Sequence, residues 1–464
     1  AVPYRPIAAA MKFVCVGCLV IASAATAASA RGAPQTTDLV KPPVNILLPN
    51  YNTVPVGPNA GLEGAYVARV GDPSAGWINP AGLSRGQTTE LSGSSGLYEL
   101  ATVSPTGFPN SGGSFDSVPS LVGLTVPKRI GGRWTLGLVV VTPIWWAQGT
   151  DSQTILDQTD SRIRFAYSSD AHYEQLVIAG AAGAAWGRWR VGGSLALTET
   201  NISRDGVVSD RIATDTALTS VLIESRASGN AIQVRPVAGL QYDASKHILL
   251  GATVRMPAVT ILKSGSYTSD AIVAGSSDQG LSFFDPSAAF AYHFPFEIHG
   301  GAAYVRPRVE MEFDIHTYTR VATYAMLSSS EPIITYAAGA AGSAPVIATQ
   351  PFSGFTSESR AVVNASAGGH VSLTADGRWR VHFGAATDRS PVGTAEQVFT
   401  RVNLYGGTLG ISGTKGGFQF TVGANYRAGS SGDFTVRRLP GVGQLPSGLR
   451  VETLGLIYAI SYKF

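Results

Sequence analysis

Apolar and polar residues alternate with a period of two through the last fourteen residues of the chain, 451–464. Large apolar side chains occupy every second position counted back from the terminus, namely Leu454, Leu456, Tyr458, Ile460, Tyr462 and Phe464. The residues between them are small or polar, apart from Ile457. This period predicts a β-strand with one apolar and one mixed face. Such a strand suits either the last core strand of a soluble sandwich or a lipid-facing strand with aromatic residues at the membrane interface.

The same alternation recurs from Gln87 onward, interrupted by turn residues, and it predicts fourteen strands in total. The expected strands are 87–104, 118–128, 132–147, 171–187, 189–204, 230–244, 246–267, 281–294, 297–320, 358–374, 378–390, 400–413, 416–430 and 449–464.

Short and long connections alternate strictly between these expected strands. The connections after even-numbered strands are tight: Lys128–Gly131, Gly187–Arg188, Ser245–Lys246, Pro295–Phe296, Asp376–Gly377 and Lys415–Gly416. Those after odd-numbered strands are long and polar: 105–117, 148–170, 205–229, 268–280, 321–357, 391–399 and 431–448. This pattern is typical of outer-membrane barrels, which have short periplasmic turns and longer external loops. We therefore expect an all-β protein, a 14-stranded antiparallel transmembrane β-barrel located in the bacterial outer membrane.

The expected strand 297–320 carries apolar residues on one face and ionisable residues on the other. The ionisable face holds Arg306, Arg308, Glu310, Glu312, Asp314 and His316. An ionisable group that faces hydrocarbon costs about 2–4 kcal/mol near the midplane, so this face is expected to line the lumen. Pairing with Glu63, Arg69 and Asp72 of the N-terminal segment would make these charges structural. The alternatives are a soluble strand with one solvated face, or binding of a carboxylate head group by Arg306 or Arg308.

Composition agrees with a barrel more than with a soluble domain. Charged residues make up 14% of the chain, glycine occurs 54 times, and the mean hydropathy is +0.13. About 25% charged residues is usual in soluble domains. Beyond the N-terminus no stretch reaches the roughly 18 apolar residues of a membrane-spanning helix. The net charge of +3 gives no indication of a nucleic acid partner.

The first thirty residues are expected to be a secretory signal peptide, with Met11 as the true start. Lys12 supplies the positive charge, Phe13–Ala22 the apolar run, and Ala28–Ala30 a small-residue cleavage site. Both cysteines of the chain lie in this segment, where they faintly resemble a lipoprotein cleavage box. The mature chain would then contain neither disulfides nor reactive thiols.

The segment 31–86 lacks the strand period and is expected to form a plug, or hatch, inside the barrel, which itself occupies 87–464. Its second half, 61–82, is rich in Gly and Ala and predicts a compact, partly helical unit. Fourteen strands enclose a lumen wider than side chains alone can fill, so a plug of this size is a natural filler.

Short motifs near both ends of the chain resemble the FadL/TodX family of outer-membrane transporters of hydrophobic compounds. They are Gly64-Ala65-Tyr66, Gly71-Asp72-Pro73-Ser74-Ala75, Asn79-Pro80-Ala81-Gly82, Asp388-Arg389-Ser390-Pro391-Val392 and Ser461-Tyr462-Lys463-Phe464. The chain departs from the family in the segment 69–73, where Asp72-Pro73 replaces an Asp-Asp pair and the preceding spacer differs. The hatch residues that the resemblance singles out are Asp72, Asn79, Pro80, Ala81 and Gly82.

The resemblance implies passive uptake of hydrophobic small molecules, either long-chain fatty acids or aromatic and aliphatic hydrocarbons, across the outer membrane. In the family the ligand leaves sideways through a gap in the wall at the third strand, while the hatch blocks the axial path. The implied partners are outer-membrane lipid and lipopolysaccharide, and the barrel-assembly machinery, which would read the strand ending in Phe464. The resemblance implies a monomer that is not an enzyme and uses neither a cofactor nor a metal.

The third expected strand contains Pro143 followed by Ile144, Trp145 and Trp146. Proline cannot donate a ladder hydrogen bond, so it marks a bulge or a break in strand pairing. These residues are candidates for the lateral gap, although a proline at the external rim beside an aromatic belt explains them equally well. The apolar residues of 321–357 form either an external capture surface or a loop packed over the barrel mouth.

Other classes of barrel protein remain as alternatives at this point. An outer-membrane phospholipase or protease needs a Ser, His or Asp constellation, and no local motif supplies one. The seven histidines are scattered without metal-ligand spacing. A general porin or an adhesin has no use for the long segment that precedes the barrel.

Overall fold

The structure of the protein, a computed structural model, describes residues 47–52, 56–105, 112–127, 133–158, 161–275, 278–339, 344–394, 396, 398–436 and 445–464. The expected signal segment and the first part of the expected plug, up to residue 46, lie outside the described residues. Within the part of the chain that is described, no helix is both long enough and apolar enough to cross a membrane.

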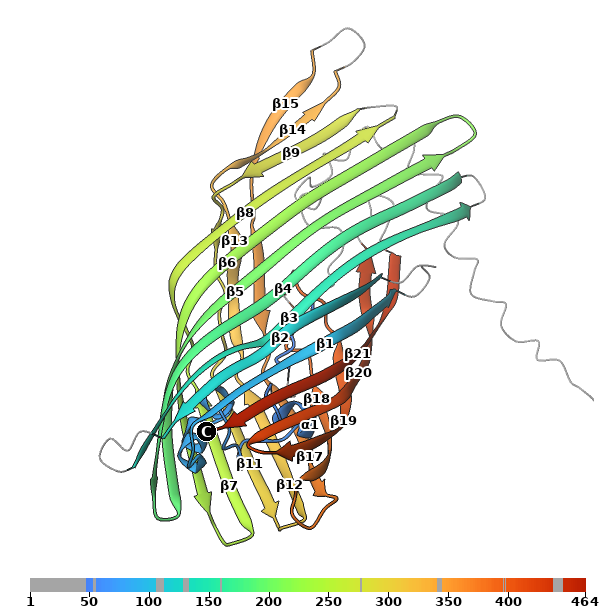
Figure 1. Ribbon diagram of the computed structural model, residues 1–464. Coiled ribbons are helices and arrows are strands. Elements are labelled where there is room, and N and C mark those ends of the chain that lie inside the picture. The colour runs from blue at the N-terminus through green and yellow to red at the C-terminus, as the bar shows by residue number, and fades with distance from the viewer. Residues whose placement is uncertain are drawn as a thin grey trace, which may run out of the picture.

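The described chain forms a closed antiparallel barrel of fourteen strands, as expected (Figure 1). Ten barrel strands are continuous: β1 Glu90–Pro105, β2 Gly112–Val126, β3 Trp134–Gln158, β4 Ser161–Trp186, β5 Trp189–Ala213, β6 Leu218–Asp243, β18 Trp379–Asp388, β19 Asn403–Lys415, β20 Phe418–Val436 and β21 Leu445–Lys463. The barrel closes where β1 pairs with β21, from Glu90–Lys463 to Pro105–Leu449.

The other four barrel strands are broken into shorter pieces. They are β7 Ile248–Arg255 with β8 Val259–Ala274; β9 Gln279–Asp285, β10 Ala289–Phe290 and β11 Glu297–Val305; β12 Val309–Tyr318, β13 Val321–Ser328 and β14 Pro332–Ala337; and β15 Val346–Pro351, β16 Phe355–Ser359 and β17 Val362–Ser372. Where these strands leave the main wall, β10, β13 and β16 pair with one another as a separate small sheet.

One tight turn lies elsewhere than the sequence predicted. The expected turn at Pro295–Phe296 is wrong, because the chain runs on into β11 and turns at 306–308. There Arg306 and Val309 exchange backbone hydrogen bonds of 2.8 and 3.3 Å. The expected strand 297–320 is therefore two strands, β11 and β12. The total stays at fourteen because 281–294 and 297–305 belong to one strand.

Most of the expected long loops at 148–170, 205–229, 268–280 and 321–357 are also wrong, because strands extend through them. The outer face of β4 explains the error, since its residues change from polar to apolar along the strand: Arg162, Arg164, Ser168, Asp170 and Glu174, then Leu176, Ile178 and Trp186. The outer faces of β5 and β6 change in the same way, from Glu199 to Leu197 and from Asn230 to Ile232. In a barrel that spans a membrane, only about 9–11 residues of each strand would cross hydrocarbon, and the rest of the strand would stand in water.

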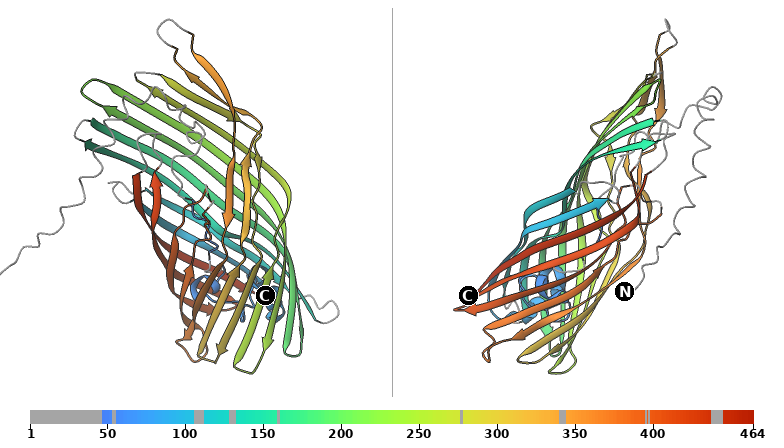
Figure 2. Two further views of the ribbon diagram at one scale, coloured as in Figure 1. Left: turned by 180° about the vertical axis from the view of Figure 1, so that it is seen from behind. Right: turned by 90° about the vertical axis from the view of Figure 1, so that its right-hand side faces the viewer.

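In the part of the wall where the outer face is polar, the inner face is apolar. Side chains that point inward there are apolar and form one continuous core with β10, β13 and β16, including Phe165, Tyr173, Tyr267, Phe283 and Met326. Figure 2 shows that the wall is much taller on the side of β3–β6 than on the side of β19–β21. We call the tall end the loop end and the opposite end, where the tight turns lie, the turn end.

Residues 56–86 lie inside the barrel near the turn end (Figures 1 and 2). They contain α1 Ala60–Glu63, α2 Ala75–Ile78 and the 3₁₀ turn η2 Pro80–Arg85, all largely buried. α1 contacts β17–β20, whereas α2 contacts β3–β5 and η2 contacts β3–β6. We call residues 56–86 the plug segment, because they reach the wall on several sides.

Inward-facing glycines allow the plug segment to approach the wall closely. A Cβ atom on Gly192 would lie 2.3 Å from the carbonyl carbon of Pro80, and one on Gly368 would lie 1.8 Å from the carbonyl oxygen of Glu63. Both distances are far below van der Waals contact, so a larger residue at either position would displace the plug backbone.

We predict that Gly192→Val destabilises the plug–barrel contact by about 1–3 kcal/mol through overpacking. The matched control is Gly180→Val on the neighbouring strand, where a Cβ meets nothing within 4 Å. Thermal unfolding of the detergent-solubilised barrel measures both. Equal melting temperatures for the two variants would contradict a tight contact at Gly192.

Candidate functional site

The wall of the barrel is interrupted between β2 and β3. Pairing runs from Val126–Leu136 to Leu121–Val141, and the next paired residues are Gly113 and Gly149. On its other edge β3 pairs with β4 almost throughout, but with an irregularity between Val141 and Ile144, where β3 holds one extra residue. Pro143 thus lies in a β-bulge, at the point where the pairing with β2 stops.

A short stretch of chain crosses the lumen beside this break. We call residues 47–52 the strap. At one end the backbone N–H of Thr400 donates to the carbonyl oxygen of Leu47 (2.9 Å), and Asn50 Nδ2 donates to the carbonyl oxygens of Asp388 (2.9 Å) and Val402 (3.0 Å). The strap is therefore fixed to the wall formed by β18 and β19.

At its other end the strap reaches the break itself. Asn52 Nδ2 donates to the carbonyl oxygen of Pro143 (2.8 Å), and Asn52 Oδ1 accepts from Arg427 Nη1 (3.0 Å). Asn52 adopts a positive φ of 50°, a conformation that asparagine tolerates better than most residues. One side chain thus links β3 to β20 across the lumen.

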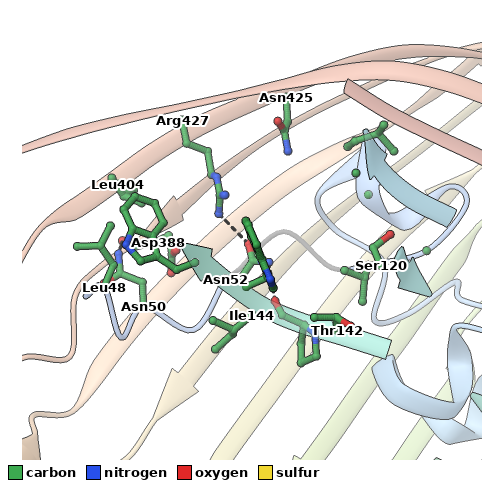
Figure 3. Close-up of a pocket in the computed structure, with 18 residues that line it drawn as sticks. Leu48, Asn50, Asn52, Ser120, Thr142, Ile144, Asp388, Leu404, Asn425 and Arg427 are labelled. Atoms are coloured by element: carbon green, nitrogen blue, oxygen red, sulfur yellow. Dashed lines mark hydrogen bonds between the residues drawn. The ribbon is translucent and has the colours of Figure 1, made fainter. Parts of the chain in front are cut away.

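A cavity of about 130 Å³ lies between the strap and the interrupted wall (Figure 3). Its lining combines apolar and uncharged polar side chains with one Arg and one Asp: Leu48, Asn50, Asn52, Val56, Ser120, Thr142, Pro143, Ile144, Trp145, Trp146, Asp388, Leu404, Asn425, Arg427 and Ile457. In Figure 3, Asn425 and Arg427 descend from the same strand toward the strap. A largely apolar cavity with a few polar groups is the usual form of a small-molecule site.

A second, smaller cavity of about 60 Å³ continues from the first toward the turn end. Both cavities are lined by Asn52, Val56 and Pro143. The second one lies against the plug segment and the ring of Trp77, over which the guanidinium of Arg255 sits at 4.1 Å.

A buried charge cluster connects the plug segment to the wall. Glu63 Oε1 accepts hydrogen bonds from His370 Nδ1 (2.9 Å) and His382 Nδ1 (2.6 Å), and Glu63 Oε2 pairs with Arg69. Arg69 also pairs with Glu312 on β12 (2.9 Å). Burial alone would raise the pKa of Glu63, but Arg69 and the two histidine hydrogen bonds outweigh it and hold that pKa well below its usual range.

Glu63, His370 and His382 bring three potential metal-ligand atoms within 4.8 Å of one another. Imidazole nitrogens with a carboxylate oxygen suit transition metals such as zinc. However, both histidine nitrogens lie at hydrogen-bond distance from the same oxygen, closer than ligands of one ion normally approach. In this arrangement the three side chains fasten the plug segment to β17 and β18.

Two further acidic side chains bind the backbone of the plug segment. Asp314 Oδ2 accepts from the backbone N–H groups of Tyr66 (2.7 Å) and Val67 (3.2 Å), and Glu312 Oε1 accepts from that of Ala68. Inward-facing carboxylates thus serve as acceptors for a segment that has little secondary structure of its own.

The hatch residues expected from sequence lie at the contact of the plug segment with the wall. Asn79 Nδ2 donates to the carbonyl oxygens of Val67 (2.9 Å) and Leu240 (3.1 Å), while its Oδ1 accepts from the N–H of Ala81 (3.2 Å). Pro80, Ala81 and Gly82 form the start of η2 and are buried. Asp72 accepts from the backbone N–H of Ser74 within the plug segment itself (2.9 Å).

The remaining predicted site residues fall in three places. Pro143, Trp145 and Trp146 all line the cavity beside the strap. Glu310, Glu312 and Asp314 lie on β12, with Glu312 and Asp314 buried. Arg306 and Arg308 do not line the lumen as expected, because they are exposed in the turn between β11 and β12.

No pattern in the sequence indicated that several residues of the site would lie next to one another. The pair His370 and His382 is created by the register of β17 with β18, and Asn52 is separated from Arg427 by 375 positions. In the expected strand 416–430, Asn425 and Arg427 alternate with apolar residues, and this period places both on an inward face. Only the closed barrel shows which partner each of them meets.

We predict that Glu63→Gln destabilises the barrel by about 3 kcal/mol, because it removes the charge that pairs with buried Arg69. The control is Glu452→Gln, where an exposed pair with Arg450 is lost and the change in stability should be much smaller. Chemical unfolding in detergent compares the two free energies. A smaller loss for Glu63→Gln than for the control would contradict the role of Glu63 in fastening the plug segment to the wall.

The stabilisation by Glu63 should also depend on pH. Because the folded protein lowers the pKa of this carboxyl, its contribution is complete above the usual value near 4.5 and decreases as the pH falls below it. We expect the difference in melting temperature between the unaltered protein and Glu63→Gln to be constant from pH 8 to 6 and to shrink toward pH 3. A difference that grew on acidification would refute this assignment.

No family model matches the chain, and no curated protein matches it either. Solved structures do resemble it, at a sequence identity too low to show more than the fold. The Pseudomonas putida toluene transporter TodX aligns with a TM-score of 0.58 and 12% identity over 89% of this chain and 99% of its own.

Two other structures give the same result. A Pseudomonas aeruginosa FadL homologue aligns with a TM-score of 0.55 and 13% identity, covering 90% of this chain and 100% of that one. The Ralstonia pickettii toluene transporter TbuX aligns with a TM-score of 0.53 and 13% identity, covering 89% and 100%. The fold of this chain is therefore the fold of these solved structures over about 90% of its length.

Proposed function

We propose that this protein is an outer-membrane channel of the FadL/TodX type, which lets hydrophobic small molecules pass inward down their gradient. One observation carries the proposal: a cavity of about 130 Å³ lies directly behind the interrupted pairing of β2 and β3. The solved structures of the same fold include transporters of toluene, and they supply the general class of ligand.

The outer surface of the barrel supports the membrane location. Large apolar side chains are exposed all round the wall toward the turn end, including Leu138, Ile178, Leu195, Leu240, Ile298, Phe313, Leu409, Phe420 and Leu456. An exposed apolar surface of this extent would drive aggregation in water, but it is the surface that hydrocarbon requires.

Within this proposal the ligand leaves through the side of the barrel. The plug segment meets the wall from β3 to β6 and from β17 to β20, so it opposes an axial route into the periplasm. The gap beside Pro143 gives an apolar molecule a way from the cavity toward the bilayer. This route spares the molecule a transfer into water, which would cost about 25 cal/mol for each Å² of apolar surface.

The apolar core at the loop end supports a role in capture from outside. Ile333 and Phe355 are buried in that core, while Ile334, Val346 and Ile347 on the β14–β15 hairpin are exposed. These residues belong to the segment 321–357, for which a capture surface and packing over the mouth were the two alternatives, and we propose that it serves both. Its inner half packs the barrel mouth, and its outer half offers an apolar surface to an incoming ligand.

The remaining partners follow from the location. Lipid and lipopolysaccharide would cover the apolar belt of a monomeric barrel. The strand ending in Phe464, whose side chain is 68% exposed, would be read by the barrel-assembly machinery. The proposed function is transport without a cofactor, and the plug segment opposes the general-porin alternative.

We predict that deleting Pro143 abolishes most uptake while the barrel still assembles. The deletion removes the extra residue of the bulge, so Thr142 and Ile144 can pair with β4 in continuous register and the gap to β2 can close. Uptake of radiolabelled toluene and of oleate, in cells without a channel of this type, should fall at least about tenfold.

The matched control is Val140→Ala, a change in the fully paired part of the same strand. Heat-modifiable migration on gels reports assembly of each variant. If the assembled deletion variant took up both probes at the unaltered rate, the lateral route would be refuted. If the unaltered protein took up neither probe, the transport proposal itself would fail.

A further inference from the structure

The cavity beside the strap contains polar atoms that have no protein partner. Asn50 Oδ1, Trp146 Nε1 and Asn425 Oδ1 are buried and form no hydrogen bond within the described part of the chain. Asn50 is only 5% exposed and Trp146 only 6%. All three residues line the same cavity.

Unpartnered polar atoms are expensive in such a place. Leaving a buried donor or acceptor without a hydrogen bond costs about 1–3 kcal/mol, so groups of this kind normally have a partner. A pure hydrocarbon in the cavity would leave all three atoms without one. A ligand that carries one donor and one acceptor would supply a partner to two of them.

We infer that the cavity selects neutral ligands of about one ring that bear a hydroxyl group, such as phenols, over hydrocarbons of the same shape. This inference rests on the proposed transport function and names its ligand class. A hydroxyl donates one hydrogen bond and also accepts, so it can satisfy one of the two amide oxygens and the indole N–H. The volume of about 130 Å³ is close to the roughly 150 Å³ of an apolar cavity that admits benzene.

The charges of the cavity disfavour a carboxylate ligand. Arg427 already donates to Asn52 Oδ1 (3.0 Å) and to Thr453 Oγ1 (3.3 Å). Asp388, which is 5% exposed, belongs to the same lining, and its charge would repel an anion. The amide oxygen of Asn425 would repel it too.

Three probes that differ in one substituent test the inference: 4-fluorophenol, 4-fluorotoluene and 4-fluorobenzoate. Fluorine NMR of the full-length barrel in detergent, corrected with detergent alone, measures their dissociation constants. We expect 4-fluorophenol to bind about fivefold to tenfold more tightly than 4-fluorotoluene, which corresponds to one hydrogen bond. We expect 4-fluorobenzoate to bind more weakly than both.

Two variants identify the responsible atoms. Asn425→Leu removes the amide at nearly constant volume, and Trp146→Phe removes the indole N–H while keeping an aromatic ring. Each should weaken 4-fluorophenol binding about fivefold and leave 4-fluorotoluene within about twofold. The control is Asn201→Leu, a partly buried asparagine on β5 that hydrogen-bonds Glu199 outside the cavity, which should change neither constant.

Each result decides between the ligand classes. Equal binding of 4-fluorophenol and 4-fluorotoluene, or a preference for 4-fluorobenzoate, overturns the inference but leaves transport of hydrophobic molecules intact. The same holds if both cavity variants retain full preference for 4-fluorophenol. If no probe binds and toluene uptake is also absent, the proposed function fails together with the inference.

Discussion

Every backbone N–H and C=O group inside a bilayer must find a hydrogen bond within the protein, and this constraint governs the whole molecule. It forces fourteen strands into a closed ring, with β1 paired to β21. It also means that the wall cannot be opened without cost. Where β3 separates from β2, Pro143 has no N–H to satisfy, and Asn52 donates to its free carbonyl oxygen. The strap therefore reduces the energetic cost of the break in the β2–β3 pairing. It also closes one side of the cavity behind this break.

The plug segment obeys the same constraint by other means. Its helices are only four residues long, so its backbone depends on side chains from the wall. Asp314 and Glu312 accept from its N–H groups, and Asn79 returns hydrogen bonds to the wall. Glu63, buried and paired with Arg69, holds the other side against β17 and β18. These interior charges thus have structural partners, whereas three of the buried polar atoms without a hydrogen bond in the described part of the chain belong to residues that line the cavity.

The sequence could predict what alternation alone determines. Strand count, barrel class and the inward face of β12 follow from period two and turn chemistry. The turn at 306–308 was missed because Pro295 and Phe296 mimic a hairpin equally well. The ends of the strands at the loop end were not predicted. The outer face of β4 becomes polar at Glu174, where the surroundings of the proposed barrel change from hydrocarbon to water, and a polar stretch of sequence resembles a loop. The contacts of Asn52 and of His370 with His382 depend on barrel closure and register, which no local pattern contains.

The exchange of inner and outer character along β3–β6 has a consequence for how this protein can change over evolutionary time. In the proposed channel, the mouth that would receive the ligand has no domain boundary, since its core is built from the same strands that form the wall toward the turn end. It cannot be gained, lost or swapped as a module. The mouth can only lengthen or shorten by two residues at a time in both strands of a hairpin. A change of one residue would turn its aromatic side chains toward water.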